Sequence, residues 1–267
     1  MTPLQTFYKS LLIGTVISAL LAACATSPLG RKQLILMPES QMQQMGATSY
    51  QQIKQSRTLS NNARDQRYVR CVASAITDAM GGGNWEVNLF ADDTANAFAL
   101  PGGKIGVHTG LLDVAQTPDQ LAAVLGHEVG HVIAHHSNER MSIQFATQTG
   151  GQLLQALSGE PSPEKQLLFA ALGIGAQVGV QLPFSRKHES ESDLIGLELM
   201  AKAGFDPRAS VTLWQNMAKQ GGEKPPEFLS THPSNETRIQ ELSQNMNKAL
   251  PLYRKAKQSG ETPNCQR

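Results

Sequence analysis

Two histidines four residues apart carry the strongest chemical signal in this chain, in the sequence His127-Glu128-Val129-Gly130-His131. Residues four apart stack on one face of an α-helix, because each residue advances about 100° around the axis. A helix would therefore bring both imidazoles to one metal ion, with Glu128 beside them. In a catalytic zinc site of this pattern the glutamate is the base that takes a proton from zinc-bound water, and it is not a ligand. The motif predicts two ligands and a catalytic base.

The residues around the motif predict the helix that it needs. Thr117 is a typical N-cap residue, Pro118 suits the first helical position, and Gln120 can close a capping box. Apolar residues then recur at spacings of three and four, as in a helix with one buried face. They are Leu121, Val124, Leu125, Val129, Val132 and Ile133. The alternative, a pair of ordinary core histidines, suits a motif on a loop better than one in a capped helix.

Catalytic zinc usually has a third protein ligand, and the best candidate is Glu189. It opens an amphipathic pattern that predicts a second helix ending near Gly204. Glu189 and Asp193 share one face of that helix, so one carboxylate can bind the metal while the other accepts the second N–H of a zinc-bound histidine. The alternative is a solvated acidic face. Glu191 points about 160° away from Glu189 and is expected to face solvent.

These motifs together resemble the HtpX and CAAX-prenyl-protease family of zinc metallopeptidases, and most closely its periplasmic, BepA- and LoiP-like branch. The matching parts are the histidine motif, segment 185–193, segment 96–103 and Thr-His-Pro at 231–233, within a resemblance that covers roughly residues 38–245. The implied fold is α+β and mainly helical, a zincin-type domain with a small β-sheet next to the motif helix. The implied cofactor is one zinc ion per chain.

The resemblance also implies roles for single residues. Glu189 becomes the third ligand, and Asp193 contacts a ligand from behind. Ser192 stands where the family commonly has alanine, a small-for-small change. His232 becomes a site residue that stabilises the oxyanion or acts as a reversible fourth ligand, and Arg238 orients the same loop. The alternative for His232 is a turn histidine that caps the following helix.

His135 and His136 follow the second ligand by four and five residues. One of the two is close enough in sequence to support a ligand from behind. We expect structural or solvent-facing roles for both.

Three short strands are expected upstream of the motif, at 87–90, 97–100 and 105–109, with a turn at 101–103. An exposed strand edge can hold a substrate peptide through backbone hydrogen bonds. The residues that the resemblance places on such an edge are Asn96, Ala97, Phe98, Ala99 and Leu100. A buried hairpin with no ligand fits the pattern equally well.

The N-terminus predicts export. Lys9 precedes an apolar run at 11–21, which is too short to span a bilayer and has the length of a signal-peptide core. Small residues before Cys24 resemble a bacterial lipoprotein box, so residues 1–23 are expected to be removed and Cys24 lipidated. The alternative is ordinary secretion. By resemblance to enterobacterial sorting, Ala25 favours the outer membrane, facing the periplasm.

With Cys24 lipidated, Cys71 and Cys265 remain, and an exported chain can keep one disulfide. Such a bond would join a C-terminal tail to the helix expected at 63–80. The alternative is burial of Cys71 as a small hydrophobic residue.

The mature chain of about 244 residues is long enough for one sizeable domain. The hydrophobic content of the full sequence, 40%, is typical of a globular protein. We expect residues 24–37 to be a tether and 38–250 the metallopeptidase domain, with a first helix at 39–56. The tail at 251–267 should be interrupted by its prolines. An insert at 141–183, with apolar runs on both sides of a Pro-flanked loop, is expected to be a helical hairpin that covers the cleft as a lid.

Removal of the signal segment takes away Lys9 and no acid, which leaves 22 basic and 22 acidic residues. This balance argues against nucleic acid as a partner. The expected activity is zinc-dependent endoproteolysis, and the resemblance implies misfolded or unassembled envelope proteins as its substrates. The competing class is a non-proteolytic zinc lipoprotein that acts as a chaperone or assembly factor for outer-membrane proteins. Association with assembly machinery or with a second copy stays open, and a fortuitous motif would bind no zinc.

Overall fold

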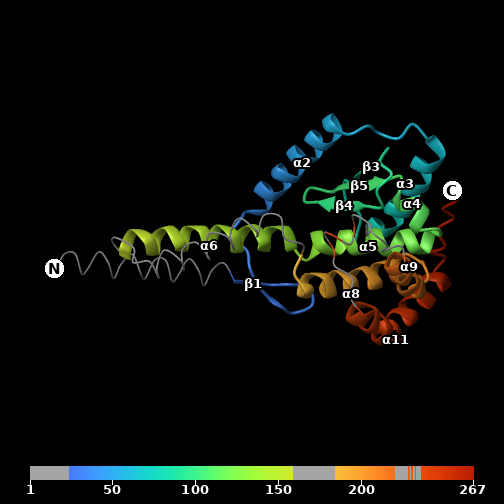
Figure 1. Cartoon of the computed structure of the whole chain (residues 1–267). Coiled ribbons are helices and arrows are strands. Elements are labelled where there is room, and N and C mark those ends of the chain that lie inside the picture. Colours follow the sequence, from blue (N-terminus) through green and yellow to red (C-terminus); the bar gives the residue numbers. More distant parts are fainter. Residues whose placement is uncertain (1–23, 159–183, 220–227, 229, 231, 233–235) are drawn as a thin grey trace. The chain divides into compact units, whose positions relative to one another are not determined.

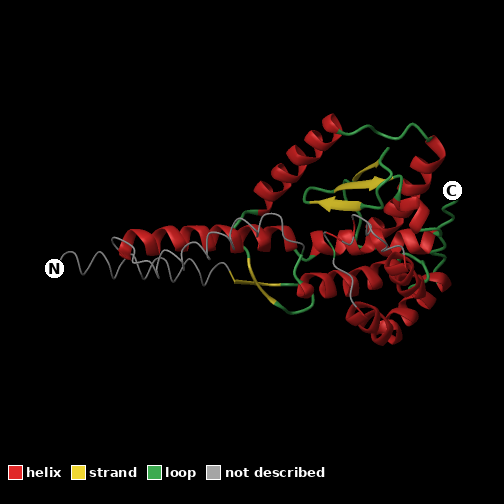
Figure 2. Ribbon diagram, in the orientation of Figure 1, coloured by secondary structure: helices red, strands yellow, loops and turns green. Residues whose placement is uncertain are grey.

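A computed structural model describes residues 24–158, 184–219 and 236–267, together with Phe228, Ser230 and His232. The chain divides into two compact units. One comprises Met1–Pro38 with Ser137–Gln181, and the other comprises Glu39–His136 with Leu182–Arg267. Helices predominate in the described residues, with two small sheets (Figure 2), so the expected mainly helical α+β class is confirmed.

In the first unit, the segment expected to be a plain tether contains two paired strands. β1 (Cys24–Thr26) runs antiparallel to β2 (Lys32–Leu34). The guanidinium of Arg31 donates to both carboxylate oxygens of Glu139, at 2.7 and 2.6 Å. Glu139 lies in α6 (His136–Ser158). The same carboxylate accepts from Gln33, so polar contacts anchor this ribbon to the helix.

The first part of the predicted insert is α6, which begins five residues before the expected start of helix at Met141. The rest of the insert, from 159 to 183, lies outside the described residues, as does the expected signal peptide at 1–23. Among the described helices, none has the length and apolar content needed to cross a bilayer.

The sheet of the second unit consists of β3 (Glu86–Phe90), β4 (Ala97–Leu100) and β5 (Lys104–His108), close to the expected ranges. Their order is β3-β5-β4, with β5 parallel to β3 and antiparallel to β4. Gly102 and Gly103 have φ angles of 82° and 71° in the turn before β5, which suits glycine there. β4 is thus an edge strand.

The two faces of this sheet differ. Ile105, Val107 and their partners on β4 belong to the main hydrophobic core. On the opposite face the ring of Phe98 lies over Gly106, where an added Cβ would come within 2.2 Å of the ring. The hydroxyl of Tyr50 donates to the Ile105 carbonyl oxygen at 2.6 Å and ties α2 (Glu39–Ser56) to this face.

The remaining helices of this unit have the following bounds: α3 (Ala63–Asp78), α4 (Leu111–Val114), α5 (Pro118–Ile133), α8 (Arg186–Lys202), α9 (Arg208–Lys219) and α11 (Glu236–Gln258). The expectation that Pro251 interrupts the C-terminal helix is wrong, because α11 continues through it. A proline in a helix removes one backbone hydrogen bond, and here the flanking residues Ala249 and Ala256 are buried and hold the helix in place.

α5 and α8 run side by side (Figure 1), and small residues set their distance. A Cβ added to Gly196 would lie 2.7 Å from the carbonyl carbon of Gly126. One added to Gly130 would lie 2.9 Å from the carbonyl oxygen of Ser192. This close packing brings the carboxylates of α8 to the histidines of α5.

Cys71 and Cys265 form a disulfide. It joins α3 to the C-terminal segment, and the Cys265 side chain is buried. The sequence had left pairing and simple burial of Cys71 both open.

Candidate metal centre

Both helices that carry the site begin at a side-chain N-cap, of which the sequence predicted the first. The Thr117 side chain accepts a hydrogen bond from the Gln120 N–H at the start of α5. The Gln120 side chain accepts from the N–H of Gln116 instead of from Thr117, so the capping box is displaced by one residue. Ser185 caps α8 by accepting from the His188 N–H. These caps fix the register in which the site residues emerge.

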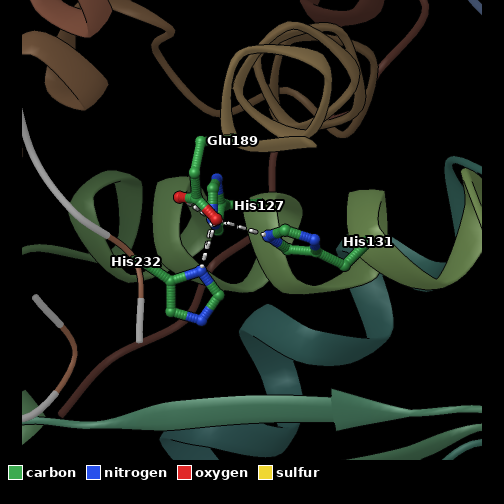
Figure 3. Close-up of side chains that lie close together, drawn as sticks. All are labelled: His127, His131, Glu189 and His232. Carbon is green, nitrogen blue, oxygen red and sulfur yellow. Dashed lines mark hydrogen bonds and ion pairs between the residues drawn. The ribbon is translucent and has the colours of Figure 1, made fainter. Parts of the chain in front are cut away.

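The structure brings His127, His131, Glu189 and His232 together, and each is buried. One donor atom from each lies within 4.8 Å of the others. Glu189 is central, with oxygens 3.4 Å from His127 Nε2, 3.4 Å from His131 Nε2 and 3.1 Å from His232 Nδ1. Figure 3 shows the four side chains pointing toward one another.

Glu128, the predicted base, lies beside this quartet and is 3% exposed. Its Oε2 accepts a hydrogen bond from the backbone N–H of Ala99 on the edge strand β4, at 3.3 Å. Its Oε1 is 3.4 Å from His232 Nε2 and makes no hydrogen bond within the described part of the chain. Burial raises the pKa of Glu128. A buried carboxylate oxygen aimed at the quartet is suited to accept a proton from a bound water.

Asp193 supports His127 from behind, as its position one turn after Glu189 suggested. Its Oδ1 lies 2.9 Å from His127 Nδ1. Arg238 holds the same carboxylate and also contacts Glu189 at 2.9 Å. It donates to the His232 carbonyl oxygen at 3.4 Å, in line with the expectation that it orients this loop. The guanidinium carbon lies 3.8 Å from the centre of the Trp214 ring.

The electrostatics of the quartet fit a bound cation. Burial alone would lower the pKa of His127, but Glu189 and Asp193 raise it to about 9. Burial would raise the pKa of Glu189, but the histidines, His127 first, hold it well below its usual range. Burial, opposed by Glu189, lowers the pKa of His131 well below its ordinary value. The site therefore combines an ionised carboxylate with imidazoles that compete for protons, and a divalent cation can replace those protons.

The donor set matches zinc in type, since imidazole nitrogens and one carboxylate are its usual ligands in catalytic sites. The residues that would hold the ion are His127, His131 and Glu189, with His232 close enough to serve as a fourth donor. Glu128 is left outside the donor set with an oxygen directed at the site.

A second layer lies behind His131, and it contains His136, one of the two histidines that the sequence left open for such a role. Glu191 was expected to face solvent, but it is 5% exposed and its Oε2 lies 3.1 Å from His136 Nε2. His136 is fully buried, and its Nδ1 lies 2.9 Å from His131 Nδ1. The expectation was wrong for Glu191 because His136 packs against the side of α8 opposite Glu189. Of the adjacent pair, only His135 faces solvent.

Aromatic rings surround the quartet, and no sequence pattern predicted them. The His232 ring stacks on Phe228 at 4.5 Å and on Phe184 at 5.4 Å, measured between ring centroids. Phe184 also lies 4.0 Å from the His131 ring. Isolated phenylalanines at these positions gave no sequence signal, and their contacts depend on the tertiary fold.

The segment predicted to bind substrate, 96–100, consists of Asn96 and the edge strand β4. Ala97 and Ala99 are buried, while Phe98 packs on the opposite face of the sheet. Asn96 accepts a backbone hydrogen bond from His108, and Leu100 is paired with Lys104. Peptide binding by this strand stays a prediction, as does lipidation of Cys24, the first residue of β1.

The family model of peptidase family M48 matches residues 59–246. The chain is 40% identical over 194 residues to the mitochondrial metalloendopeptidase OMA1 of Arabidopsis thaliana. The aligned region covers 71% of this chain and 38% of that protein. It is 43% identical over 165 residues to the protein of the same name from Schizosaccharomyces pombe. That aligned region covers 60% of this chain and 46% of that protein.

The chain is also 28% identical over 258 residues to the beta-barrel assembly-enhancing protease of Escherichia coli. Here the aligned region covers 92% of this chain and 52% of that protein. The chain therefore spans about half or less of the length of these relatives.

Proposed function

The chain belongs to peptidase family M48, and from this premise we propose that it is a zinc-dependent endopeptidase of the bacterial cell envelope, with misfolded or unassembled envelope proteins as substrates. One observation carries the proteolytic part. Glu128 is buried beside the His127, His131, Glu189 and His232 quartet, with its Oε1 3.4 Å from His232 Nε2 and without a hydrogen bond in the described part of the chain. A structural metal site has no need of such a group.

Bound zinc would supply Lewis acidity, which activates a water and polarises the scissile carbonyl. The protein supplies the remaining steps. Glu128 accepts the proton of the attacking water at Oε1 and returns it to the leaving amine. His232 lies within reach of the developing oxyanion and can stabilise it as a hydrogen-bond donor. The edge strand β4 aligns an extended peptide next to Glu128, since Ala99 already contacts that carboxylate.

Two observations support a place in the cell envelope and a relationship to the periplasmic branch. The Escherichia coli relative, whose name describes a protease that enhances beta-barrel assembly, aligns with most of the chain. The N-terminal sequence also has the features of a lipoprotein signal that ends at Cys24. The mitochondrial relatives share the peptidase region, so their location carries no weight for this chain.

One feature favours a second candidate, a latent or non-proteolytic zinc lipoprotein that assists outer-membrane assembly. His232 Nδ1 lies 3.1 Å from Glu189 and 3.2 Å from His127 Nε2. If all four donors bind the metal together, no position remains for water and the centre is closed.

Cleavage of casein by the purified full chain, with a Glu128→Gln variant beside it, tests the proposed activity. Both proteins should contain zinc, and the variant should cleave about 10² to 10⁴ times more slowly. Glu198→Gln, at an exposed acid on α8, is the control and should cleave at the parent rate. If both proteins contain zinc and neither cleaves, the closed or non-proteolytic account replaces the peptidase.

The location has a separate test. After cell fractionation the parent chain should sediment with outer membranes, and a Cys24→Ser variant should not. Equal release of both proteins into the soluble periplasmic fraction would contradict lipid anchoring.

A further inference from the structure

We propose that His136 and Glu191 are positioning residues that hold the zinc ligand His131 in its metal-binding tautomer and orientation. The inference rests on the zinc site of the proposed function. His136 bridges the other two side chains, with Nδ1 2.9 Å from His131 Nδ1 and Nε2 3.1 Å from Glu191 Oε2. All three side chains are buried.

The positions of the protons follow from these contacts. His131 faces the quartet with Nε2, so it can offer a lone pair there only if its proton is on Nδ1. That proton then points at His136 Nδ1, which must accept it. A neutral His136 consequently carries its own proton on Nε2, facing the Glu191 carboxylate. With His136 neutral and Glu191 ionised, each link has one donor and one acceptor only in the tautomer of His131 that binds a metal.

The neighbours of His136 fit this arrangement. The Ser192 hydroxyl lies 3.2 Å from His136 Nδ1 and can donate to this nitrogen when it is an acceptor. The ring of His188 stacks on His136 with centroids 4.4 Å apart and an angle of 22° between the planes. Ser192, which replaces the usual alanine of the family, therefore touches the bridge. Together these contacts fix the plane of the His136 ring.

The arrangement complements the one behind His127. Asp193 contacts His127 Nδ1 directly, whereas Glu191 reaches His131 Nδ1 through His136. Both carboxylates come from α8, two residues apart. A carboxylate behind a ligating imidazole fixes its ring and raises its basicity, and loss of such a partner typically lowers metal affinity by about 10- to 100-fold.

The zinc affinity of the purified full chain tests the inference, measured by competition with a chromogenic chelator. Glu191→Gln keeps the size of the side chain and removes its charge. His136→Phe keeps the ring and removes both nitrogens. Each variant should bind zinc about 10- to 100-fold more weakly than the parent. The control Glu198→Gln, on an exposed face of the same helix, should bind as the parent does.

Two further readouts separate positioning from general destabilisation. In His136→Asn the amide oxygen can replace Nδ1 as acceptor, so part of the affinity should return. The double variant of Glu191→Gln with His136→Phe should lose no more affinity than His136→Phe alone, because Glu191 acts through His136. Circular dichroism checks that each variant folds. If His136→Phe does not fold, the zinc affinity of Glu191→Gln alone tests the positioning role.

The outcomes are distinct. Parent-like zinc affinity in Glu191→Gln, or additive losses in the double variant, would overturn the positioning role while leaving the peptidase proposal intact. Absence of zinc binding by the parent chain would overturn both.

Discussion

Asp193 accepts two hydrogen bonds from the buried Arg238 guanidinium, at 2.6 and 2.7 Å, and presents the same carboxylate to the His127 ring. Burial would raise the pKa of Asp193, but Arg238 lowers it, so the carboxylate stays ionised. An ionised acceptor keeps the His127 proton on Nδ1 and leaves Nε2 for the metal. Arg238 therefore acts on the metal centre through Asp193, in addition to its direct contact with Glu189.

Replacement of this carboxylate should weaken metal binding. In Asp193→Asn the acceptor at His127 loses its charge and Arg238 loses one of its charged partners, so zinc affinity should fall about 10- to 100-fold. Chelator competition on the full chain measures the change. Asp113→Asn, at an exposed acid on α4, is the matched control. Parent-like affinity in Asp193→Asn would show that His127 needs no charged partner.

Removal of the metal should lower the melting temperature. Without a cation, the quartet leaves an ionised Glu189 and three imidazoles buried together. A ligand that binds only the folded state stabilises it by about 2.7 kcal/mol at a free concentration 100 times its Kd. Calorimetry before and after chelation measures this. Added zinc should raise the melting temperature of a His131→Ala variant only slightly. An equal rise in the parent and in this variant would show that the stabilising ion binds elsewhere.

The disulfide between Cys71 and Cys265 should contribute strongly to stability, because it closes a loop with a sequence separation of 194 residues. Loss of a native disulfide typically costs about 2 to 5 kcal/mol in free energy of unfolding. Addition of dithiothreitol should therefore lower the denaturation midpoint of the parent. The double variant Cys71→Ser with Cys265→Ser should have a low denaturation midpoint from the start, and dithiothreitol should not change it. Equal midpoints for reduced and oxidised parent would contradict a closed bond in solution.

Glu86 should stabilise the sheet in a pH-dependent way. Lys54 and Lys104 lie 2.6 and 3.1 Å from its carboxylate, and they lower its pKa from the ordinary value of 4.5, Lys54 most. A lowered folded-state pKa means that the stabilisation is complete above about pH 4.5 and is lost as the pH falls through the folded value.

The Glu86 carboxylate is partly exposed, so solvent screening keeps the effect below about 1 kcal/mol. Glu86→Gln should be less stable than the parent at pH 7, and the two denaturation midpoints should converge below pH 4. A constant difference across this range would assign the effect to packing instead of charge.

The parts of the fold and site that sequence predicted are those encoded locally. Thr117 and Pro118 define the start of α5 through side-chain chemistry within one turn. The spacing of His127 and His131 then follows from helix geometry alone. Glu189 required a second helix in register with the first, and the resemblance to a known family supplied that pairing.

The unpredicted parts depend on packing between segments. His135 has a φ of 53°, an uncommon value for a residue other than glycine, and it turns the chain so that His136 comes back to His131. No pattern in the sequence predicts that turn. Glu191 was assigned to solvent because helix geometry gives its direction but not what covers it. Pro251 likewise shows that tertiary packing can keep a helix continuous where local propensity predicts a break.

The most direct test of the metal centre is an anomalous difference map from crystals of the full chain, collected on both sides of the zinc absorption edge. The account predicts one strong zinc peak per chain, bonded to Nε2 of His127, Nε2 of His131 and the carboxylate of Glu189, with Glu128 outside the coordination sphere. No peak at the quartet in zinc-supplemented crystals, or a peak that Glu128 ligates directly, would contradict it.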